Sequence, residues 1–288
     1  MFAVVGITGK VGAAVARSLL SADQPVRAVV RDRSRTAPWA QLGCDIAVAD
    51  LSDTEALTAA FAGTAGVFAM VPPVFDPAPG FPEAMGFINP LRAALARAKP
   101  ARVVALSTVG ADAPQPNLLN ALGRMESALG SLLMPVAFLR AAWFMENAEW
   151  DIDSAKSGRI QSYLQPLDRT VPMVSTDDVG RAAAALLQER WEGRRVVELE
   201  GPHRVSPNAL AAAFAKALGT AVRAEIVPRE QWEAIFRAQG MKHPTPRIQM
   251  IEGFNAGWID FADHGAHARK GYISIDQAIT TLIQRQRA

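Results

Sequence analysis

Cysteine and tyrosine are scarce in this chain, whose 288 residues include one cysteine and two tyrosines. The single cysteine, Cys44, excludes a disulfide within the chain and fits a reducing compartment. We therefore expect it to be a small core residue of a cytoplasmic protein. Long hydrophobic runs are scarce too. No stretch approaches the roughly 18 consecutive apolar residues of a membrane-spanning helix, so we expect no membrane association.

An excess of charge of one sign is also missing. The formal net charge is +2, and the basic residues are scattered along the chain, which argues against a nucleic-acid surface. His264 and His267 have a spacing seen in metal sites, but no further ligand follows them, so we expect no metal. Half of the residues are hydrophobic, which is enough for one large domain or for a domain with a smaller appendage.

The most informative segment is the glycine pattern of the first dozen residues. The apolar run 2–5 predicts a buried strand, and the helical spacing of apolar residues from Val11 onward predicts a helix. A strand that enters a helix through a glycine-rich turn is typical of a pyrophosphate site, because the helix N–H groups and dipole attract the anion. A tight turn without a ligand is the alternative. We expect the following residues to bind the cofactor: Gly6, Thr8, Gly9, Lys10, Val11 and Gly12.

Strand-like and helix-like segments alternate after this turn. The alternation predicts an α/β fold, a doubly wound parallel (Rossmann) sheet with helices on both faces and strand order 3-2-1-4-5-6. The expected strands are 2–5, 26–30, 46–49, 67–71, 103–106 and 136–139. The expected helices are 11–21, 54–61, 82–98 and 119–131, with a short helix near 36–42.

The sequence pattern changes after about Asn147, where tryptophan, glycine and proline residues interrupt the alternation of strand-like and helix-like segments. Helices are expected at 180–188 and 207–218, and strands at 196–199 and 224–227. We expect residues 1–147 to form a dinucleotide-binding domain. Residues 148–288 are expected to form a smaller α+β substrate lobe that closes over the carboxyl ends of the strands and partly returns to the main sheet.

The end of the second expected strand indicates which dinucleotide binds. An acidic residue there would hold the 2′-hydroxyl of NAD, whereas Arg31 favours the 2′-phosphate of NADP, with Arg33 and Arg35 in support. We therefore expect NADP(H) to be the preferred cofactor. Asp32 keeps NAD(H) open, and a solvated basic loop is the alternative without a ligand.

Further cofactor contacts are expected at the carboxyl ends of the neighbouring strands, where open α/β sheets bind their ligands. Asp50 could accept a hydrogen bond from the adenine amino group while Leu51 packs on the base. Asp50 could equally be a turn or helix-capping residue. The remaining candidates follow the fourth and fifth expected strands: Val71, Pro72, Ser107 and Thr108.

These motifs, together with the run Leu-Arg-Ala-Ala-Trp-Phe-Met-Glu-Asn at 139–147, resemble the NmrA-like family, an atypical group of the short-chain dehydrogenase/reductase superfamily. The resemblance covers most of the chain and is strongest up to Asn147. The family includes NAD(P)H-dependent quinone oxidoreductases, a triphenylmethane dye reductase and cofactor-sensing regulators without turnover. The resemblance implies a Rossmann fold in which Phe144 and Met145 lie near the nicotinamide and Asn147 also contacts the cofactor.

One motif of the superfamily is absent. Ordinary members use a Tyr-x-x-x-Lys pair, in which the tyrosine donates a proton. Neither Tyr163 nor Tyr272 is followed by a lysine at that spacing. In the NmrA-like family a lysine or histidine often stands four residues before a glutamate. The matching glutamate here is Glu126, and Leu122 occupies the position of the basic residue.

An acceptor that stabilises its own negative charge is the chemistry that this sequence favours. Hydride addition to a quinone gives a stabilised phenolate, and addition to a conjugated cation gives no oxyanion. We expect an oxidoreductase that uses NADPH to reduce a quinone-like or conjugated small molecule, with no assigned catalytic residue. Each candidate for the acceptor site could instead belong to the core: Pro73, Phe75, Trp143, Trp150 and Trp232.

A second hypothesis follows from the same missing pair. A protein that binds NADP(H) without turnover could act as a redox sensor and pass its state to a protein partner. A homodimer is compatible with either hypothesis. Oxidation of NADPH by an added acceptor would favour the enzyme, whereas tight binding without oxidation would favour the sensor.

Overall fold

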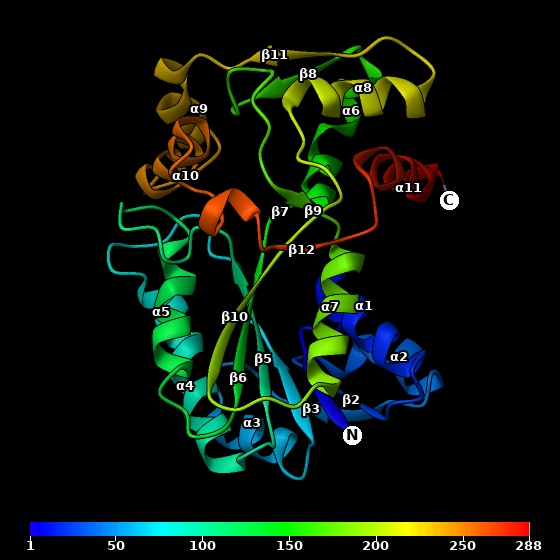
Figure 1. The fold of residues 1–288 in the computed structure, drawn as a ribbon, viewed down its shortest axis with the longest axis vertical. Coiled ribbons are helices and arrows are strands. Elements are labelled where there is room, and N and C mark those ends of the chain that lie inside the picture. Colours follow the sequence, from blue (N-terminus) through cyan, green and yellow to red (C-terminus); the bar gives the residue numbers. More distant parts are fainter. Residues whose placement is uncertain (288) are drawn as a thin grey trace.

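An eight-stranded sheet forms the centre of the molecule, which we describe from a computed structural model covering residues 1–287 (Figure 1). Every pair of neighbouring strands is parallel, and the order is β12-β10-β6-β5-β4-β1-β2-β3. The strands are β1 (Phe2–Val5), β2 (Val26–Val30), β3 (Asp45–Val48), β4 (Gly66–Ala69), β5 (Val103–Thr108), β6 (Val136–Ala141), β10 (Arg194–Glu200) and β12 (Arg269–Lys270). The predicted order 3-2-1-4-5-6 is confirmed for the first six strands.

Helices cover both faces of this sheet, as the near-continuous apolar strands predict. One face packs against α1 (Lys10–Leu20), α2 (Ala37–Gln41) and α7 (Thr176–Gln188). The other packs against α3 (Thr54–Phe61), α4 (Pro82–Ala98) and α5 (Asn120–Leu129). Helices α1 and α7 approach closely because Gly180 has no side chain. A Cβ at that position would lie 2.4 Å from the Cβ of Ala14.

The chain returns to the sheet after residue 147, and this adds two strands to the six that the sequence predicted for the first part of the chain. Strand β10 pairs with β6, so that Val197 lies beside Leu139. The short strand β12 pairs with β10 at the outer edge. The expected strand at 196–199 is therefore part of the main sheet.

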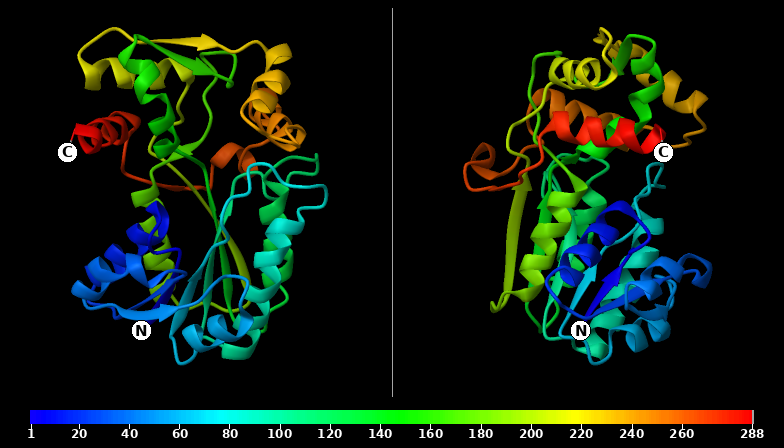
Figure 2. Two further views of the ribbon diagram at one scale, coloured as in Figure 1. Left: turned by 180° about the vertical axis from the view of Figure 1, so that it is seen from behind. Right: turned by 90° about the vertical axis from the view of Figure 1, so that its right-hand side faces the viewer.

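The remaining elements lie above the carboxyl ends of the strands in Figure 1, and both views of Figure 2 show the same arrangement. They include two pairs of short parallel strands, β7 (Trp143–Phe144) with β9 (Met173–Val174) and β8 (Arg159–Ser162) with β11 (Arg223–Ile226). The other elements are η2 (Met145–Asp151), α6 (Ile152–Lys156), α8 (Pro207–Leu218), η3 (Arg229–Gln231), α9 (Trp232–Ala238), α10 (Thr245–Ala256), η4 (Ala262–Gly265) and α11 (Ile275–Arg287).

This upper part has hydrophobic clusters of its own. One is built around Phe214 and Ile279, and a second around Trp232 and Phe236. Within residues 1–287 no helix combines the length and apolar character that crossing a bilayer requires. The division of the chain at residue 147 stays a prediction, because α7, β10 and β12 belong to the layers of the main sheet.

Candidate cofactor and acceptor site

The glycine turn between β1 and α1 folds tightly on itself. Gly6 has a φ of +69°, and its carbonyl oxygen accepts a hydrogen bond of 2.9 Å from the Gly9 amide. A Cβ at Gly12 would lie 2.2 Å from the same oxygen, so position 12 tolerates no side chain. A Cβ at Gly9 would approach nothing closer than 3.4 Å. Gly6 and Gly12 therefore build the turn, and Gly9 leaves its outer surface open.

The first turn of α1 has the character of an anion site. Gly9 is the N-cap residue and provides no side chain to accept from the first N–H groups, and no acidic residue lies in that turn. The unpaired N–H groups of a helix N-terminus and its dipole attract a phosphate. A surface without side chains, next to N–H groups without a cap, fits the pyrophosphate of a dinucleotide.

Two charged side chains connect this turn to its neighbours. Lys10 pairs with Glu149 of η2, and its Nζ lies 3.5 Å from the carbonyl oxygen of Glu146. On the other side, the guanidinium of Arg35 donates a bond of 3.4 Å to the carbonyl oxygen of Thr8. The glycine turn thus contacts both the segment expected near the nicotinamide and the basic loop expected near the adenine ribose.

Arg31 and Asp32 have different surroundings in the loop after β2, which includes η1 (Arg33–Arg35). The amide and hydroxyl of Ser34 both donate to Asp32 and hold the pKa of this carboxyl below its usual value, with a smaller effect from the charge of Arg31. The carboxylate of Asp32 is therefore occupied within its own turn. Arg31 is exposed at the strand end, where its guanidinium can face a 2′-phosphate.

Asp50 is also occupied by a local turn. Its Oδ1 accepts from the amide of Ser52 at 2.8 Å and from the hydroxyl at 2.6 Å, and these bonds lower its pKa. The N-cap of α3 is Asp53 instead. Of the two interpretations that the sequence left open, the structure places Asp50 in a turn, and a contact with adenine stays a prediction. Leu51 packs half-buried against the core beside it.

Ser107, at the end of β5, faces α5 through a buried network. Its hydroxyl donates to Glu126 Oε1 at 2.5 Å, and Arg140 of β6 holds both oxygens of that carboxylate at 2.9 and 2.6 Å. Arg140 also donates to Asp112 at 2.6 Å. Burial alone would lower the pKa of Arg140, but the two carboxylates outweigh it and raise the pKa. Ser107 is almost fully buried, and Thr108 is more accessible at the same strand end.

No role of Arg140 was predicted from the sequence. One feature of the sequence could have indicated its importance: Arg140 is a cation within the otherwise apolar strand 136–141, and a buried cation requires a partner of opposite charge. The partner, Glu126, lies on a helix that precedes the strand. After the fourth strand, Val71 is buried and Pro72 is partly exposed, so both remain at the edge where the sequence predicted them.

The segment from Phe144 onward continues as η2, a helix with three residues per turn, so that every third side chain points to the same side. Phe144, Asn147 and Trp150 fall on the side that stays accessible, whereas Met145 and Ala148 are buried. This pattern presents one aromatic and polar face beside the expected nicotinamide position.

Glu146, in the same segment, has a function that the sequence did not reveal. Its carboxylate accepts from the Ser175 hydroxyl at 3.0 Å and from the Thr176 amide at 2.9 Å, where α7 begins. The residue is buried. Glu146 therefore fixes η2 to the N-terminus of α7, which leaves Asn147 and its neighbours in a defined position.

The structure brings two of the acceptor candidates together and separates a third. Phe75 and Trp150 are 48% and 69% exposed, and their rings meet edge to face at 6.3 Å. Trp143 packs against Phe254 at 5.2 Å. Trp232 is fully buried, and its indole donates to a backbone carbonyl, so it offers no surface to an acceptor. Pro73 is exposed beside Phe75.

The proline-rich loop 72–81 is fixed to the upper part of the molecule. Asp76 accepts from the amides of Lys242 and His243 at 2.8 and 2.6 Å, on the connection between α9 and α10. On the same upper side, Tyr163 packs on Phe236 at 5.2 Å, and Arg247 of α10 lies 4.5 Å from the centre of the Phe236 ring.

These contacts join the loop 72–81 to η2 and to the connection between α9 and α10, and they join the segment after β8 to α9. Most of these contacts join residues far apart in the chain, so no local sequence pattern predicts them.

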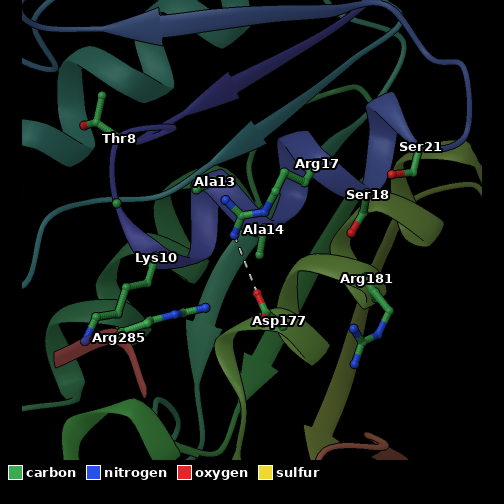
Figure 3. Close-up of a pocket in the computed structure, with 11 residues that line it drawn as sticks. Thr8, Lys10, Ala13, Ala14, Arg17, Ser18, Ser21, Asp177, Arg181 and Arg285 are labelled. Atoms are coloured by element: carbon green, nitrogen blue, oxygen red, sulfur yellow. Dashed lines mark ion pairs between the residues drawn. The ribbon is translucent and has the colours of Figure 1, made fainter. Parts of the chain in front are cut away.

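A hollow of about 880 Å³ begins at the glycine turn but leads away from the strand ends (Figure 3). Figure 3 shows it between α1 and α7, where Arg17 and Asp177 pair at 3.7 Å. It is lined by Thr8, Gly9, Lys10, Ala13, Ala14, Arg17, Ser18, Ser21, Asp177, Arg181 and Arg285. Only its first three residues belong to the expected cofactor site.

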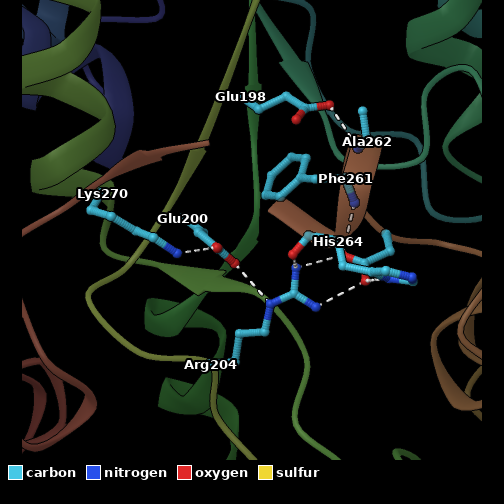
Figure 4. Close-up of polar contacts among 8 residues, drawn as sticks. Glu198, Glu200, Arg204, Phe261, Ala262, His264 and Lys270 are labelled. Carbon is cyan, nitrogen blue, oxygen red and sulfur yellow. Dashed lines mark hydrogen bonds and ion pairs between the residues drawn. The ribbon is translucent and has the colours of Figure 1, made fainter. Parts of the chain in front are cut away.

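A charged cluster at the outer edge of the sheet has a structural role (Figure 4). Buried Glu200 accepts from Arg204 and Lys270, and Arg204 also holds Asp260 with two bonds of 2.9 and 2.7 Å. The ring of His264 lies 3.0 Å from Asp260. The cluster therefore connects β10, β12 and η4. Within residues 1–287 no three side chains of the metal-binding types gather at one point.

An open parallel sheet with a glycine turn at the head of its first helix is the architecture of the Rossmann class. Within this class, the chain belongs to the NmrA-like family, whose model matches residues 1–279. The chain is 27% identical to the NAD(P)H azoreductase of Xenophilus azovorans over 246 residues, which cover 84% of this chain and 82% of the azoreductase.

Two solved structures share the fold over nearly the whole chain. The triphenylmethane reductase of Citrobacter sp. is 20% identical with a TM-score of 0.79, and the match covers 98% of this chain and 99% of that one. The NADPH-dependent quinone oxidoreductase of Escherichia coli in complex with NADPH is 21% identical with a TM-score of 0.80, and the match covers 98% of this chain and 100% of that one. At this level of identity the likeness establishes the fold.

Proposed function

We propose that the protein is an NADPH-dependent reductase of quinone-like or otherwise conjugated small molecules. The observation that carries the proposal is the connection from Gly9 through Lys10 to η2. Lys10 links the glycine turn, a cradle whose open surface at Gly9 would accept a pyrophosphate, to η2. The accessible side chains of that segment are Phe144, Asn147 and Trp150. The names of the azoreductase, the dye reductase and the quinone oxidoreductase support the same class of reaction.

Different residues would bind different parts of the cofactor. The turn around Gly9 would bind the pyrophosphate, and Arg31 would bind the 2′-phosphate through charge-assisted hydrogen bonds. The accessible face of η2 would border the nicotinamide, together with Thr108 and Pro72 at the strand ends. When bound, the reduced nicotinamide supplies a hydride.

The acceptor would lie against exposed aromatic side chains. Phe75 and Trp150 offer flat apolar surface next to η2, and the loop 72–81 is held in place by Asp76. Stacking of a conjugated molecule on such surface orients it and removes water from its reacting face. This arrangement favours extended aromatic acceptors over small aliphatic ketones.

NADPH consumption with a panel of acceptors tests the proposal. We expect the purified protein to oxidise NADPH with a quinone, a cationic triphenylmethane dye or an azo dye, and NADH more slowly. A Gly9→Ala variant is the control, because its methyl group fits the folded turn but occupies the place of the pyrophosphate. Tight NADPH binding without oxidation by any acceptor would instead favour a redox sensor that acts on a protein partner.

A further inference from the structure

The hollow between α1 and α7 is bordered by positively charged side chains (Figure 3). They come from three helices that lie far apart in the sequence: Lys10 and Arg17 from α1, Arg181 from α7 and Arg285 from α11. Of the described residues that line the hollow, only Asp177 is acidic. The fold therefore gathers four cations around one carboxylate.

One face of α1 forms a wall of the hollow. The residues that it contributes recur every three or four positions and therefore share a side of the helix: Lys10, Ala13, Ala14, Arg17, Ser18 and, at the C-cap, Ser21. The two alanines take up little space, so a volume of about 880 Å³ stays open between the polar side chains. Small-molecule sites in proteins have volumes of roughly 300–1,000 Å³.

The hydrogen-bond donors around this hollow are only partly used within the protein. An arginine side chain carries five N–H donors. Arg17 comes within 3.7 Å of Asp177, which is too long for a hydrogen bond, and Arg181 donates to Asp178 through one nitrogen. Among the side chains that the structure describes, none accepts a hydrogen bond from Arg285 or pairs with it. The hollow thus has more donors than the protein has acceptors for them.

Asp178 does not fill this need, because its carboxylate has other partners. The side chain is 2% exposed and accepts from the amides of Tyr272 and Ile273 at 3.0 Å each. It therefore fixes α7 to the segment before α11. Asp177 is the carboxylate that faces the cations of the hollow, and it is partly accessible.

The hollow and the expected dinucleotide site meet at the glycine turn but extend in different directions. Lys10 pairs with Glu149 on the side of η2, whereas Arg17 lies two turns further along α1, about 10 Å along the helix axis. The N-terminus of α7 is already occupied, since Glu146 and Ser175 accept from its first amides. An anion in the hollow would therefore be held by side chains.

We propose that the hollow binds a small molecule that carries phosphate groups. A phosphate group brings up to two negative charges and several acceptor oxygens to one point, and guanidinium groups bind it through paired N–H donors. The hydroxyls of Ser18 and Ser21 supply further donors at the same wall. The ligand would take the place of Asp177 beside Arg17. This site is separate from the proposed reductase function and does not depend on it.

Calorimetric titration of the purified protein with inorganic pyrophosphate tests the site. We expect the affinity to fall about 10-fold in Arg17→Gln and about 10-fold in Arg181→Gln, because each substitution removes hydrogen bonds between charged groups. Arg237→Gln is the matched control. It removes an exposed arginine that pairs with Glu233 on α9, and it should leave the affinity as it was. The absence of binding, or an equal loss in all three variants, would overturn the proposal.

Asp177→Asn should change the affinity in the opposite direction. Without its charge this side chain no longer competes for Arg17, so pyrophosphate should bind about 3-fold more tightly. Asp153→Asn changes the net charge by the same amount, since it removes an exposed carboxylate that pairs with Lys156, and it should have no effect. Unchanged or weaker binding in Asp177→Asn would contradict the proposal.

A Gly9→Ala background separates the hollow from the glycine turn, where pyrophosphate has a second place to bind. We expect Gly9→Ala to keep its affinity for pyrophosphate, and the added Arg17→Gln to lower it by the same factor as in the wild type. A loss in Gly9→Ala without any loss in Arg17→Gln would place the anion at the turn and overturn the site. A protein that binds pyrophosphate in the hollow but does not bind NADPH would overturn only the proposed function.

Discussion

Gly12 lies directly against the carbonyl group of Gly6, and a Cβ at position 12 would come within 2.2 Å of its oxygen. Backbone atoms cannot move aside as a flexible side chain can. We therefore expect Gly12→Ala to open the turn between β1 and α1, to lower the free energy of unfolding by about 1–3 kcal/mol, and to abolish dinucleotide binding. Urea denaturation and calorimetry with NADPH measure the two effects.

Gly9→Ala separates folding from binding at the same turn. The methyl group would meet nothing closer than 3.4 Å, so the unfolding free energy should change by less than about 1 kcal/mol. Binding of NADPH should nevertheless be lost, because the methyl group occupies the surface where the pyrophosphate approaches. A Gly9→Ala protein that binds NADPH normally would contradict the proposed binding of the pyrophosphate at the glycine turn.

Arg31 decides between the two dinucleotides if its guanidinium binds the 2′-phosphate. A hydrogen bond to a charged group contributes about 1.5–3 kcal/mol, so Arg31→Ala should weaken NADPH binding by roughly 10- to 100-fold. NADH has no phosphate at this position and should bind almost unchanged. Calorimetric titration of both cofactors checks the difference.

A matched control for this substitution is Arg237→Ala, which removes an exposed arginine that pairs with Glu233 on α9. It changes the net charge by the same amount and should leave both affinities as they were. Equal losses of NADPH and NADH in Arg31→Ala would show that the side chain supports the loop and does not read the phosphate.

The pair of Glu126 and Arg140 stabilises the carboxyl end of the sheet because both groups are withdrawn from water. Their side chains are 12% and 11% exposed. Removal of Glu126 leaves the buried Arg140 with only the exposed Asp112 as a partner, so we expect Glu126→Ala to lower the unfolding free energy by about 3 kcal/mol, the lower end of the range for a broken buried pair. Urea denaturation at neutral pH measures the loss.

An exposed pair of the same type provides the comparison. Glu55 and Arg97 are 75% and 51% exposed, and water screens their attraction. Glu55→Ala should therefore cost less than about 1 kcal/mol. Similar losses in the two variants would mean that burial does not govern the strength of the pair at Glu126.

The fold could be predicted well where local patterns determine it. The strands Phe2–Val5 and Val26–Val30 and the helices Thr54–Phe61 and Pro82–Ala98 have the predicted bounds, because apolar periodicity and turn residues act over short distances. The edge strand β12 was not predicted, since Arg269–Lys270 is exposed and has no apolar pattern. Its pairing with β10 depends on the folded sheet.

The site was predictable only in its local parts. The glycine turn is contained within a dozen residues, and its geometry follows from them. The ion pair of Glu126 with Arg140 and the contact of Asp76 with His243 join distant segments, which no local pattern reveals. Trp150 and Trp232 are the same residue type, yet one is exposed and the other fully buried, because tertiary packing alone separates them.

The stability of the protein should depend on pH through Asp151. Burial raises the pKa of this carboxyl to about 6 from the ordinary value of 3.8, so between these values the folded chain holds the proton more tightly than the unfolded chain. This contribution to stability is complete below about pH 4 and is lost as the pH rises through about 6. The difference corresponds to at most about 3 kcal/mol.

The Asp151→Asn variant, which cannot ionise at this position, should escape that loss. Relative to the wild type, its unfolding free energy should therefore increase by up to about 3 kcal/mol between pH 4 and pH 8, as urea denaturation at several pH values can measure. Asp153→Asn should show no such trend. A stability difference independent of pH would contradict the buried position of Asp151.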